Sequence, residues 1–295
     1  MRRAQDLRPD PSAQPGLSAS RPLLLAVSVV VALLVGLTAG PAQAQTRSAS
    51  SVDAADAAWA QALAPSGTGG TLAVVVAPVQ SARASLADRT PAPVGNAAAD
   101  RPTYSASLVK LLVVEDVLHR ARTGALTLTT ADRQLLMSML ITSDDPAMNT
   151  AWERWGADQM VRDGAARYGL TSTAPPAELG QWGQTVTTAG DMARFLAALP
   201  VTAHPEDATT MRFWLSMATP LGADGFDQSF GLLAQDTPGT AAKQGWMCCV
   251  ADTRHLHSVG YVDDTVVVLL GEVPATTGWD VAIAGLDAAA AALLR

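Results

Sequence analysis

Lysine is almost absent from this 295-residue sequence. Of its 20 basic residues, 18 are arginine, and the two lysines are Lys110 and Lys243. Arginine serves as well as lysine as a surface cation, so a chain that favours arginine this strongly needs a reason to use lysine. Lysine can lose its proton when it is buried near another cation, whereas arginine effectively cannot. The two lysines therefore mark positions where an amine is needed and a permanent charge is not.

Charge and cysteine are also scarce. Only 16% of the residues are charged and 48% are hydrophobic, which is the composition of a folded globular protein and excludes a largely disordered chain. The only cysteines, Cys248 and Cys249, are adjacent in the sequence. Neighbouring side chains on a strand point to opposite faces, so we interpret this pair as two small buried apolar residues, and a vicinal disulfide or a redox pair is the alternative.

The first 44 residues have the pattern of a secretory signal peptide. Arginines precede an apolar run at Leu23–Leu37, and the small-x-small sequence at residues 42–44 resembles a cleavage site. As a helix this run would span about 22 Å, less than the roughly 30 Å of a bilayer core, which favours cleavage over an uncleaved anchor. No cysteine follows that could carry a lipid. We predict a signal peptide at 1–44, a linker at 45–52 and one domain at 53–295, exported to the cell envelope or secreted.

The charge of the exported part limits its partners. Residues 45–295 carry a net charge of −9, which argues against nucleic acid or an anionic membrane as the main partner. Membrane attachment is expected only if the signal segment stays uncleaved. No phosphate-cradling glycine loop or H-E-x-x-H helix is present. We expect a monomer that needs no cofactor and acts on a small molecule.

The hydrophobic periodicity changes twice along the chain. The pattern predicts a helix at Val52–Ala64 and a strand at Leu72–Val79. The segment between residues 81 and 101 is long enough for one short edge strand. Helical spacing then dominates, at Ser107–Gly124, Thr130–Ile141, from Pro146 onward, and at Thr188–Leu199. The last part reads as strands at Ala241–Val250, His255–Asp263 and Thr265–Val273 and a helix at Trp279–Leu294. This order predicts an α/β (α+β) fold, with an antiparallel sheet flanked by terminal helices and an inserted all-helical subdomain.

The lysines stand beside groups that could use them chemically. Ser107 and Lys110 are three residues apart on a predicted helix, so their side chains share one face. A neutral Lys110 could accept the Ser107 proton, and a positive Lys243 nearby would lower the pKa of Lys110 from its usual value of about 10.4. Two ordinary surface lysines are the alternative, and that alternative does not account for the spacing.

Three segments resemble motifs of one enzyme family. Residues 107–110 (S-L-V-K), 143–145 (S-D-D) and 243–245 (K-Q-G) are similar to the S-x-x-K, S-D-N and K-T-G elements of class A β-lactamases and related penicillin-binding proteins, in the same order. Asn149 matches an asparagine that lies six residues after the serine of the second element. The resemblance extends from Val52 to the C-terminus. It implies a β-lactamase/transpeptidase-like fold and an acyl-enzyme formed with a β-lactam or a peptidoglycan peptide.

The resemblance also implies a role for each matching residue. Ser107 would be the acylated nucleophile and Lys110 its activator. Ser143 would relay a proton to the leaving nitrogen, and Lys243 would supply positive charge. The backbone N–H groups of Ser107 and Trp246 would form the oxyanion hole. The residues that would contact substrate are Asp145, Asn149, Gln244, Gly245 and Trp246. Asp145 is also expected to cap the helix that begins at Pro146.

The sequence departs from the family pattern at substrate-contacting positions and in the loop that serves deacylation. Asp145 replaces an asparagine, and Gln244 replaces a hydroxyl residue. The glutamate that activates the deacylating water has no counterpart, because Pro176 and Gly180 fall at the two water-binding positions. Glu178 could take over only if the loop were rebuilt. We therefore predict slow deacylation, and a D,D-peptidase or esterase and a non-catalytic envelope binding protein remain alternatives.

Two histidines form a weaker pattern. His255 and His257 lie two apart on a predicted strand and so face the same side, as paired metal ligands can. No acid or cysteine pattern completes a site around them. We predict ordinary strand histidines and no bound metal.

Overall fold

The apolar segments at the two ends of the chain pair into one sheet. The computed structural model describes residues 41–81 and 92–295, so most of the predicted signal peptide lies outside the described residues. The strands run antiparallel in the order β2 (Val94–Gly95), β1 (Thr71–Pro78), β7 (Thr265–Pro274), β6 (Thr253–Val262), β5 (Thr240–Val250). The three predicted C-terminal strands and the short edge strand are present, and β5 forms the opposite edge of the sheet.

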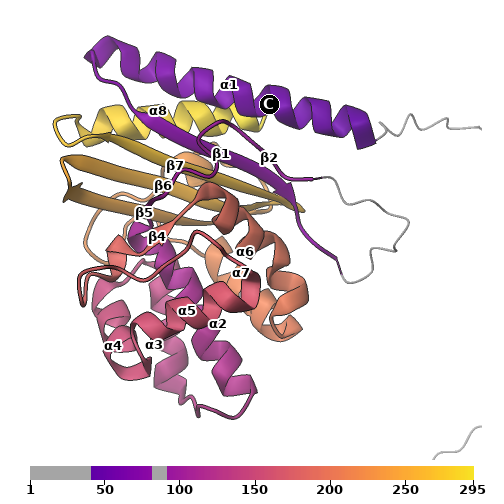
Figure 1. Cartoon of the computed structure of the whole chain (residues 1–295), viewed down its shortest axis with the longest axis vertical. Coiled ribbons are helices and arrows are strands. Elements are labelled where there is room, and N and C mark those ends of the chain that lie inside the picture. Colours follow the sequence, from indigo (N-terminus) through magenta and orange to yellow (C-terminus); the bar gives the residue numbers. More distant parts are fainter. Residues whose placement is uncertain (1–40, 82–91) are drawn as a thin grey trace, which may run out of the picture. The chain divides into compact units, whose positions relative to one another are not determined.

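Helices cover both faces of this sheet (Figure 1). The first and last helices, α1 (Pro41–Leu63) and α8 (Trp279–Leu293), lie together on one face. The segment between β2 and β5 supplies the other face and contains the pair β3 (Thr103–Tyr104) and β4 (Val186–Thr187). Its helices are α2 (Val109–Arg122), α3 (Thr130–Ile141), α4 (Asp145–Trp155), α5 (Asp158–Tyr168), α6 (Ala189–Thr202) and α7 (Pro205–Ser216). This arrangement confirms the predicted sheet with terminal helices and an inserted helical block.

Each face of the sheet has its own hydrophobic core, because successive residues of a strand point to opposite sides. On β1, Val74 belongs to the core shared with α1 and α8, where Trp59 and Leu286 are also buried. The next residue, Val75, belongs to the larger core shared with the helical block. The sheet is therefore fixed from both sides, and its edge strand β5 is held rigidly against the helices.

The boundaries differ from the predicted ones at the N-terminus and in the helical block. Residues 45–52, predicted as a linker, lie within α1, because alanine favours helix and the buried side chains of Val52 and Ala55 pack in the core beneath α8. Helices α5 and α7 were not predicted from the sequence. Among residues 41–81 and 92–295, no helix has the length and hydrophobicity needed to cross a membrane.

A buried ion cluster joins α5 to α2 inside the helical block. The Arg167 guanidinium contacts the Glu115 carboxylate and lies 2.8 Å from the Asp116 carboxylate. Both acidic side chains are almost fully buried, at 2% and 0% exposed. Burial raises the pKa of Glu115, while the charge of Arg167 opposes that rise. Removing the arginine would leave the buried Glu115 carboxylate without a cation and Asp116 with only its longer contact, 3.4 Å, to Arg120.

We expect Arg167→Ala to lower the free energy of unfolding by about 3–5 kcal/mol, because it leaves the buried Glu115 carboxylate unpaired. The matched control is Arg162→Ala on the same helix, whose ion pair with Asp158 is solvent-exposed and should cost at most about 1 kcal/mol. Urea denaturation of both variants measures the difference. Equal losses in the two variants would contradict a structural role for the buried cluster.

Candidate active site

Ser107 lies at the start of the central helix of the block. A short 3-10 turn, η2 (Ala106–Leu108), leads directly into α2 and places Ser107 one helical turn before Lys110. The Lys110 ammonium nitrogen lies 3.0 Å from the Ser107 hydroxyl oxygen. The preceding residue, Ala106, has a φ of 47°, a left-handed conformation that is uncommon for a residue other than glycine and is often found at functional sites. The predicted serine-lysine pair is therefore in contact.

Lys110 is fully buried and surrounded by oxygen atoms. Its Nζ lies 2.6 Å from the Ser143 carbonyl oxygen, 3.2 Å from the Ser143 hydroxyl and 2.5 Å from Asp145 Oδ1. Burial lowers the pKa of Lys110, and the negative charge of Asp145 partly opposes this by favouring the protonated form. Lys110 is thus an amine whose protonation is balanced between burial and one carboxylate.

Lys243 approaches the same serine from the edge strand. Its Nζ donates to the Ser143 hydroxyl at 2.7 Å and to the Gln244 carbonyl oxygen at 2.6 Å. Burial holds the pKa of Lys243 well below its usual value, and the positive charge of Lys110 lowers it further. Ser107, Lys110, Ser143 and Lys243 therefore form one chain of hydrogen bonds that joins α2, the α3–α4 turn and β5.

An open pocket of about 340 Å³ gives access to Ser107. It lies between the helical block, the loop before β4 and the end of β5. Its lining includes three of the predicted substrate-contacting residues and is formed by Ala106, Ser107, Asp145, Asn149, Gly180, Gln181, Trp182, Gly183, Trp246 and Met247. Asp145 is the only carboxylate in that lining. The pocket therefore brings the Ser107 nucleophile, the Asp145 carboxylate and two tryptophans to one small volume.

The wall formed by β5 depends on the absence of a side chain at Gly245. A Cβ atom there would lie 3.2 Å from the Ser105 carbonyl oxygen and 3.4 Å from the Ser107 nitrogen. The next residue, Trp246, stacks on Phe226 with ring centroids 4.9 Å apart and donates its indole N–H to Asp224 at 3.0 Å. Gly245 thus allows the strand to reach the nucleophile, and Trp246 forms the rim beside it.

Gln244 does not lie in the pocket. Its side chain is buried and its amide donates to the backbone carbonyls of Gln228 and Phe230. The prediction of a substrate contact was wrong because alternate residues of a strand face opposite sides. Lys243 and Gly245 face the helical block, so the side chain between them faces away. Strand alternation applied to the sequence would have given this result.

The helix α4 is capped one residue earlier than predicted. The Asp144 carboxylate accepts the Ala147 N–H at 2.8 Å, whereas Asp145 is the first helical residue and binds Lys110. Asp145 was predicted both as the cap and as a substrate contact. The structure assigns the cap to its neighbour and leaves Asp145 half-exposed in the pocket.

The loop before β4 places a tryptophan beside Lys110. The Trp182 ring lies over Lys110, with the Nζ atom 4.9 Å from the ring centroid, and its indole N–H donates to Asn149 Oδ1 at 2.8 Å. Glu178 is exposed and is not part of the pocket lining. Sequence analysis missed Trp182, because its position follows from tertiary contacts and from no local pattern.

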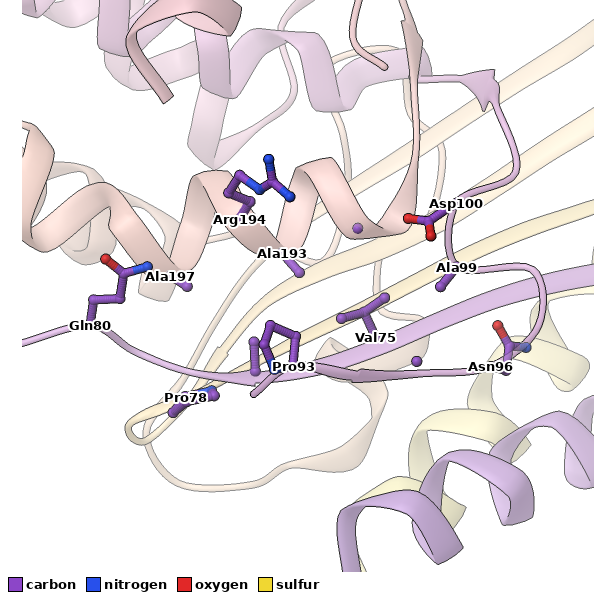
Figure 2. A pocket seen from close by; sticks show the side chains of 13 residues that line it. Val75, Pro78, Gln80, Pro93, Asn96, Ala99, Asp100, Ala193, Arg194 and Ala197 are labelled. Atoms are coloured by element: carbon purple, nitrogen blue, oxygen red, sulfur yellow. The ribbon is translucent and has the colours of Figure 1, made fainter. Parts of the chain in front are cut away.

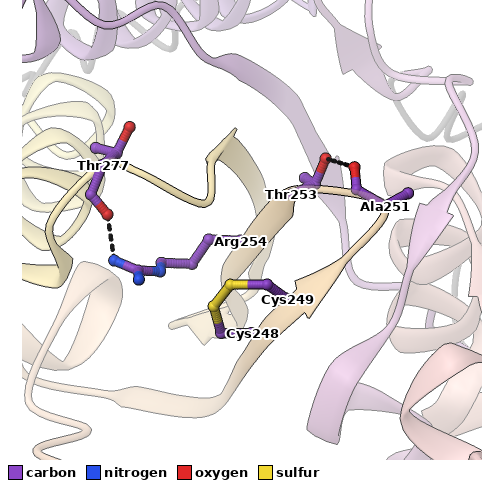
Figure 3. The surroundings of a disulfide bond; sticks show 6 residues. All are labelled: Cys248, Cys249, Ala251, Thr253, Arg254 and Thr277. Carbon is purple, nitrogen blue, oxygen red and sulfur yellow. Dashed lines mark hydrogen bonds between the residues drawn. A yellow bond between two sulfur atoms is a disulfide. The ribbon is translucent and has the colours of Figure 1, made fainter.

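The two cysteines differ from the prediction. Cys248 and Cys249 are joined by a disulfide bond and are exposed (Figure 3). The prediction assumed a regular strand, but the β5–β6 register shifts between Met247 and Val250, so alternation does not hold there. Because Met247 lines the Ser107 pocket, this irregular segment continues directly from the pocket wall.

The histidines lie inside the sheet, separate from the pocket lining. His255 Nδ1 faces Glu272 at 3.5 Å, and His257 Nε2 lies 2.8 Å from the Tyr104 carbonyl oxygen. Burial lowers the pKa of each ring to about 4, so both are neutral at pH 7. In the described part of the chain, no three His, Cys, Asp or Glu side chains are grouped as a metal site requires.

A second cavity, of about 460 Å³, lies between β1 and α6 (Figure 2). It shares no residue with the Ser107 pocket and contains the charged residues Asp100 and Arg194. Arg194 donates to the Gly169 carbonyl oxygen at 2.7 Å. Among the described residues, its lining contains no serine, cysteine, lysine or histidine.

Comparison with known proteins gives partial matches in sequence and extensive matches in structure. No model of a known protein family matches the chain. Proteins of Mycobacterium tuberculosis and Mycobacterium bovis named "Putative lipoprotein LppW" are 36% identical to it over 169 residues. The match covers 54% of this chain and 51% of those proteins, so the chain spans about half the length of the curated relatives it matches.

Solved β-lactamase structures superpose on most of the chain. That of Xanthomonas campestris superposes with a TM-score of 0.62 at 20% identity, covering 82% of this chain and 97% of its own. Those of Sphaerobacter thermophilus and Chitinophaga pinensis give TM-scores of 0.61 and 0.64 at 17% and 11% identity, and cover 82% of this chain and 96% and 97% of their own. The predicted β-lactamase-like fold is confirmed: this chain has the fold of the class A β-lactamases.

Proposed function

We propose that this chain is an exported active-site-serine hydrolase that forms an acyl-enzyme through Ser107 with a β-lactam or a D-alanyl-type amide and releases it slowly. The observation that supports this most strongly is the chain of contacts from Ser107 through Lys110 and Ser143 to Lys243, at 3.0, 3.2 and 2.7 Å, beside an open pocket. A merely structural set of polar residues would not need two buried lysines around one serine hydroxyl.

Acylation can be written with these groups alone. The Ser107 proton passes to neutral Lys110 as Oγ attacks the carbonyl carbon, and the backbone N–H groups of Ser107 and Trp246 receive the oxyanion. The C–N bond then breaks, and the leaving nitrogen takes a proton through Ser143. Lys110 then transfers the proton that it took from Ser107 to Ser143, which replaces the proton that Ser143 gave to the leaving nitrogen. Burial and mutual repulsion of the lysines both favour a state with fewer than two protons on the pair.

The pocket lining offers no free general base for deacylation. The only carboxylate in the pocket lining is Asp145, and it is already paired with Lys110. Glu178 lies outside that lining. A general base contributes about 10² to 10⁴ in rate, so a site without one should hold its acyl group far longer than it takes to form.

The decisive measurement is intact mass after incubation with benzylpenicillin. We expect one covalent adduct per protein, located on Ser107 and persistent. Lys110→Arg keeps the charge but cannot act as a base, so it should label about 10² to 10⁴ times more slowly. Ser105→Ala is the matched control, because Ser105 is a buried serine whose hydroxyl donates only to the adjacent Ala106 carbonyl, and it should label like the parent protein.

Three outcomes would contradict parts of this proposal. An arginine variant that labels as fast as the parent protein would remove Lys110 as the base. Sustained turnover without an adduct would show that a deacylating base exists. No adduct at all would favour the non-catalytic envelope binding protein, and an adduct formed only with esters or D-alanyl peptides would favour the esterase or D,D-peptidase.

The pH dependence of labelling should depend on Asp145. Its carboxylate stabilises protonated Lys110, so Asp145→Asn should lower the pKa of Lys110 and move the acid limb of the acylation rate to lower pH. A displacement of one pH unit corresponds to about a tenfold faster rate on that limb. Asp144→Asn is the control, since asparagine also caps a helix and Asp144 acts on Lys110 less strongly than Asp145 does. An unchanged profile in Asp145→Asn would exclude this role.

Export is proposed from the N-terminal pattern, and the lipoprotein name of the mycobacterial relatives agrees with an envelope location. Protein from the native host should begin at or near Gln45 and be found outside the cytoplasm. N-terminal sequencing of fractionated cells checks this. Recovery of residues 1–44 on membrane-bound protein would instead identify an uncleaved anchor.

A further inference from the structure

Trp182 is held firmly against the acylation machinery. It begins a 3-10 turn, η3 (Trp182–Gln184), and its neighbour Gly183 packs so closely that a Cβ there would lie 3.2 Å from the Met247 sulfur. The turn is also tied to the nucleophile segment, because the Ser105 N–H donates to the Thr185 carbonyl oxygen at 2.8 Å. The position of the indole is therefore fixed by contacts on both sides.

The indole fills the space beside Lys110. A water oxygen placed between Lys110 Nζ and the ring would lie about 2.8 Å from the nitrogen and more than about 3 Å from the ring plane. The nitrogen and the ring would then be close to 6 Å apart. The ring centroid lies only 4.9 Å from Nζ. No water fits between them, so the face of the site next to Lys110 is covered by carbon atoms.

The side chain of Asn149, which also lines the pocket, is hydrogen-bonded to the same indole. Asn149 Oδ1 accepts the Trp182 indole N–H at 2.8 Å and is thereby less available to orient a water molecule. Asp145, the only carboxylate in the pocket lining, is paired through Oδ1 with Lys110 at 2.5 Å. One oxygen of Asn149 and one of Asp145 are therefore already bound to neighbouring side chains, which weakens their hold on a water near the Ser107 ester.

We propose that Trp182 is a water-excluding side chain that protects the acyl-enzyme from hydrolysis, an inference that rests on the proposed acylation of Ser107. In hydrolysis, a water oxygen attacks the acyl carbonyl carbon and the bond from that carbon to Ser107 Oγ breaks. One water proton goes to Ser107 Oγ, and the product leaves as a carboxylic acid that gives its proton to solvent. Trp182 prevents the first event by occupying the space from which the water would attack.

The test separates acylation from deacylation in two variants. Trp182→Ala opens the space beside Lys110, whereas Trp182→Phe keeps a ring there and loses only the hydrogen bond to Asn149. After labelling with benzylpenicillin and removal of the free compound, intact mass gives the adduct lifetime, and the labelling phase gives the acylation rate. We expect Trp182→Ala to shorten the lifetime at least about tenfold because water gains access to the ester. Trp182→Phe should stay within about threefold of the parent protein, since a ring still excludes water.

The outcomes distinguish this inference from the proposed function. Absence of an adduct in the parent protein would refute the acylation itself. Equal lifetimes in the parent protein and Trp182→Ala, or an equal shortening in Trp182→Phe, would overturn water exclusion while leaving acylation intact. If Trp182→Ala does not fold, Trp182→Leu serves the same comparison, because it removes the ring and retains apolar packing. Its lifetime should lie between those of the parent protein and an open site, and a lifetime equal to that of Trp182→Phe would overturn the inference.

Discussion

The site depends on two buried lysines that share one serine hydroxyl. Bringing Lys110 and Lys243 out of water and toward each other is unfavourable, because both desolvation and like-charge repulsion oppose it. The structure offsets this with oxygen atoms: the carbonyl of Ser143 and the carboxylate of Asp145 for Lys110, and the carbonyl of Gln244 for Lys243. Because these oxygens come from separate segments, the helical block and the sheet must meet in one fixed arrangement.

The sheet achieves this through its edge. Strand β5 is bonded to β6 on one side only, so its other side is free to face η2 and the α3–α4 turn. Gly245 permits the close approach, and the cores on both faces of the sheet keep the strand in place. The unusual φ values of Ala106 and Ser143, 47° and 54°, occur at the residue before Ser107 and at Ser143 itself, the two places that β5 approaches. Rigid packing elsewhere is what holds such conformations.

The sequence predicts the parts of this site that depend on local pattern. Helical spacing places Lys110 on the same face as Ser107, and the apolar C-terminal runs identify β5, which presents Lys243. Side-chain direction at single positions is less secure: Gln244 was assigned from its motif although strand alternation turns it away, and the α4 cap was placed one residue late. The disulfide at Cys248 depends on a register shift that no local pattern encodes.

Trp182 shows why loops carry the least predictable part of the function. The loop before β4 has no periodicity, and its tryptophan reaches Lys110 only through tertiary packing. Once there, it acts on Lys110 in the same direction as Asp145, since the face of an aromatic ring and a carboxylate both favour the charged amine. Burial of Lys110 and its repulsion with Lys243 oppose them. Because Lys110 is already fully buried, its own desolvation is set by the folded protein. Asp145 is half-exposed in the pocket, so it is the contact of Lys110 that a bound substrate can alter.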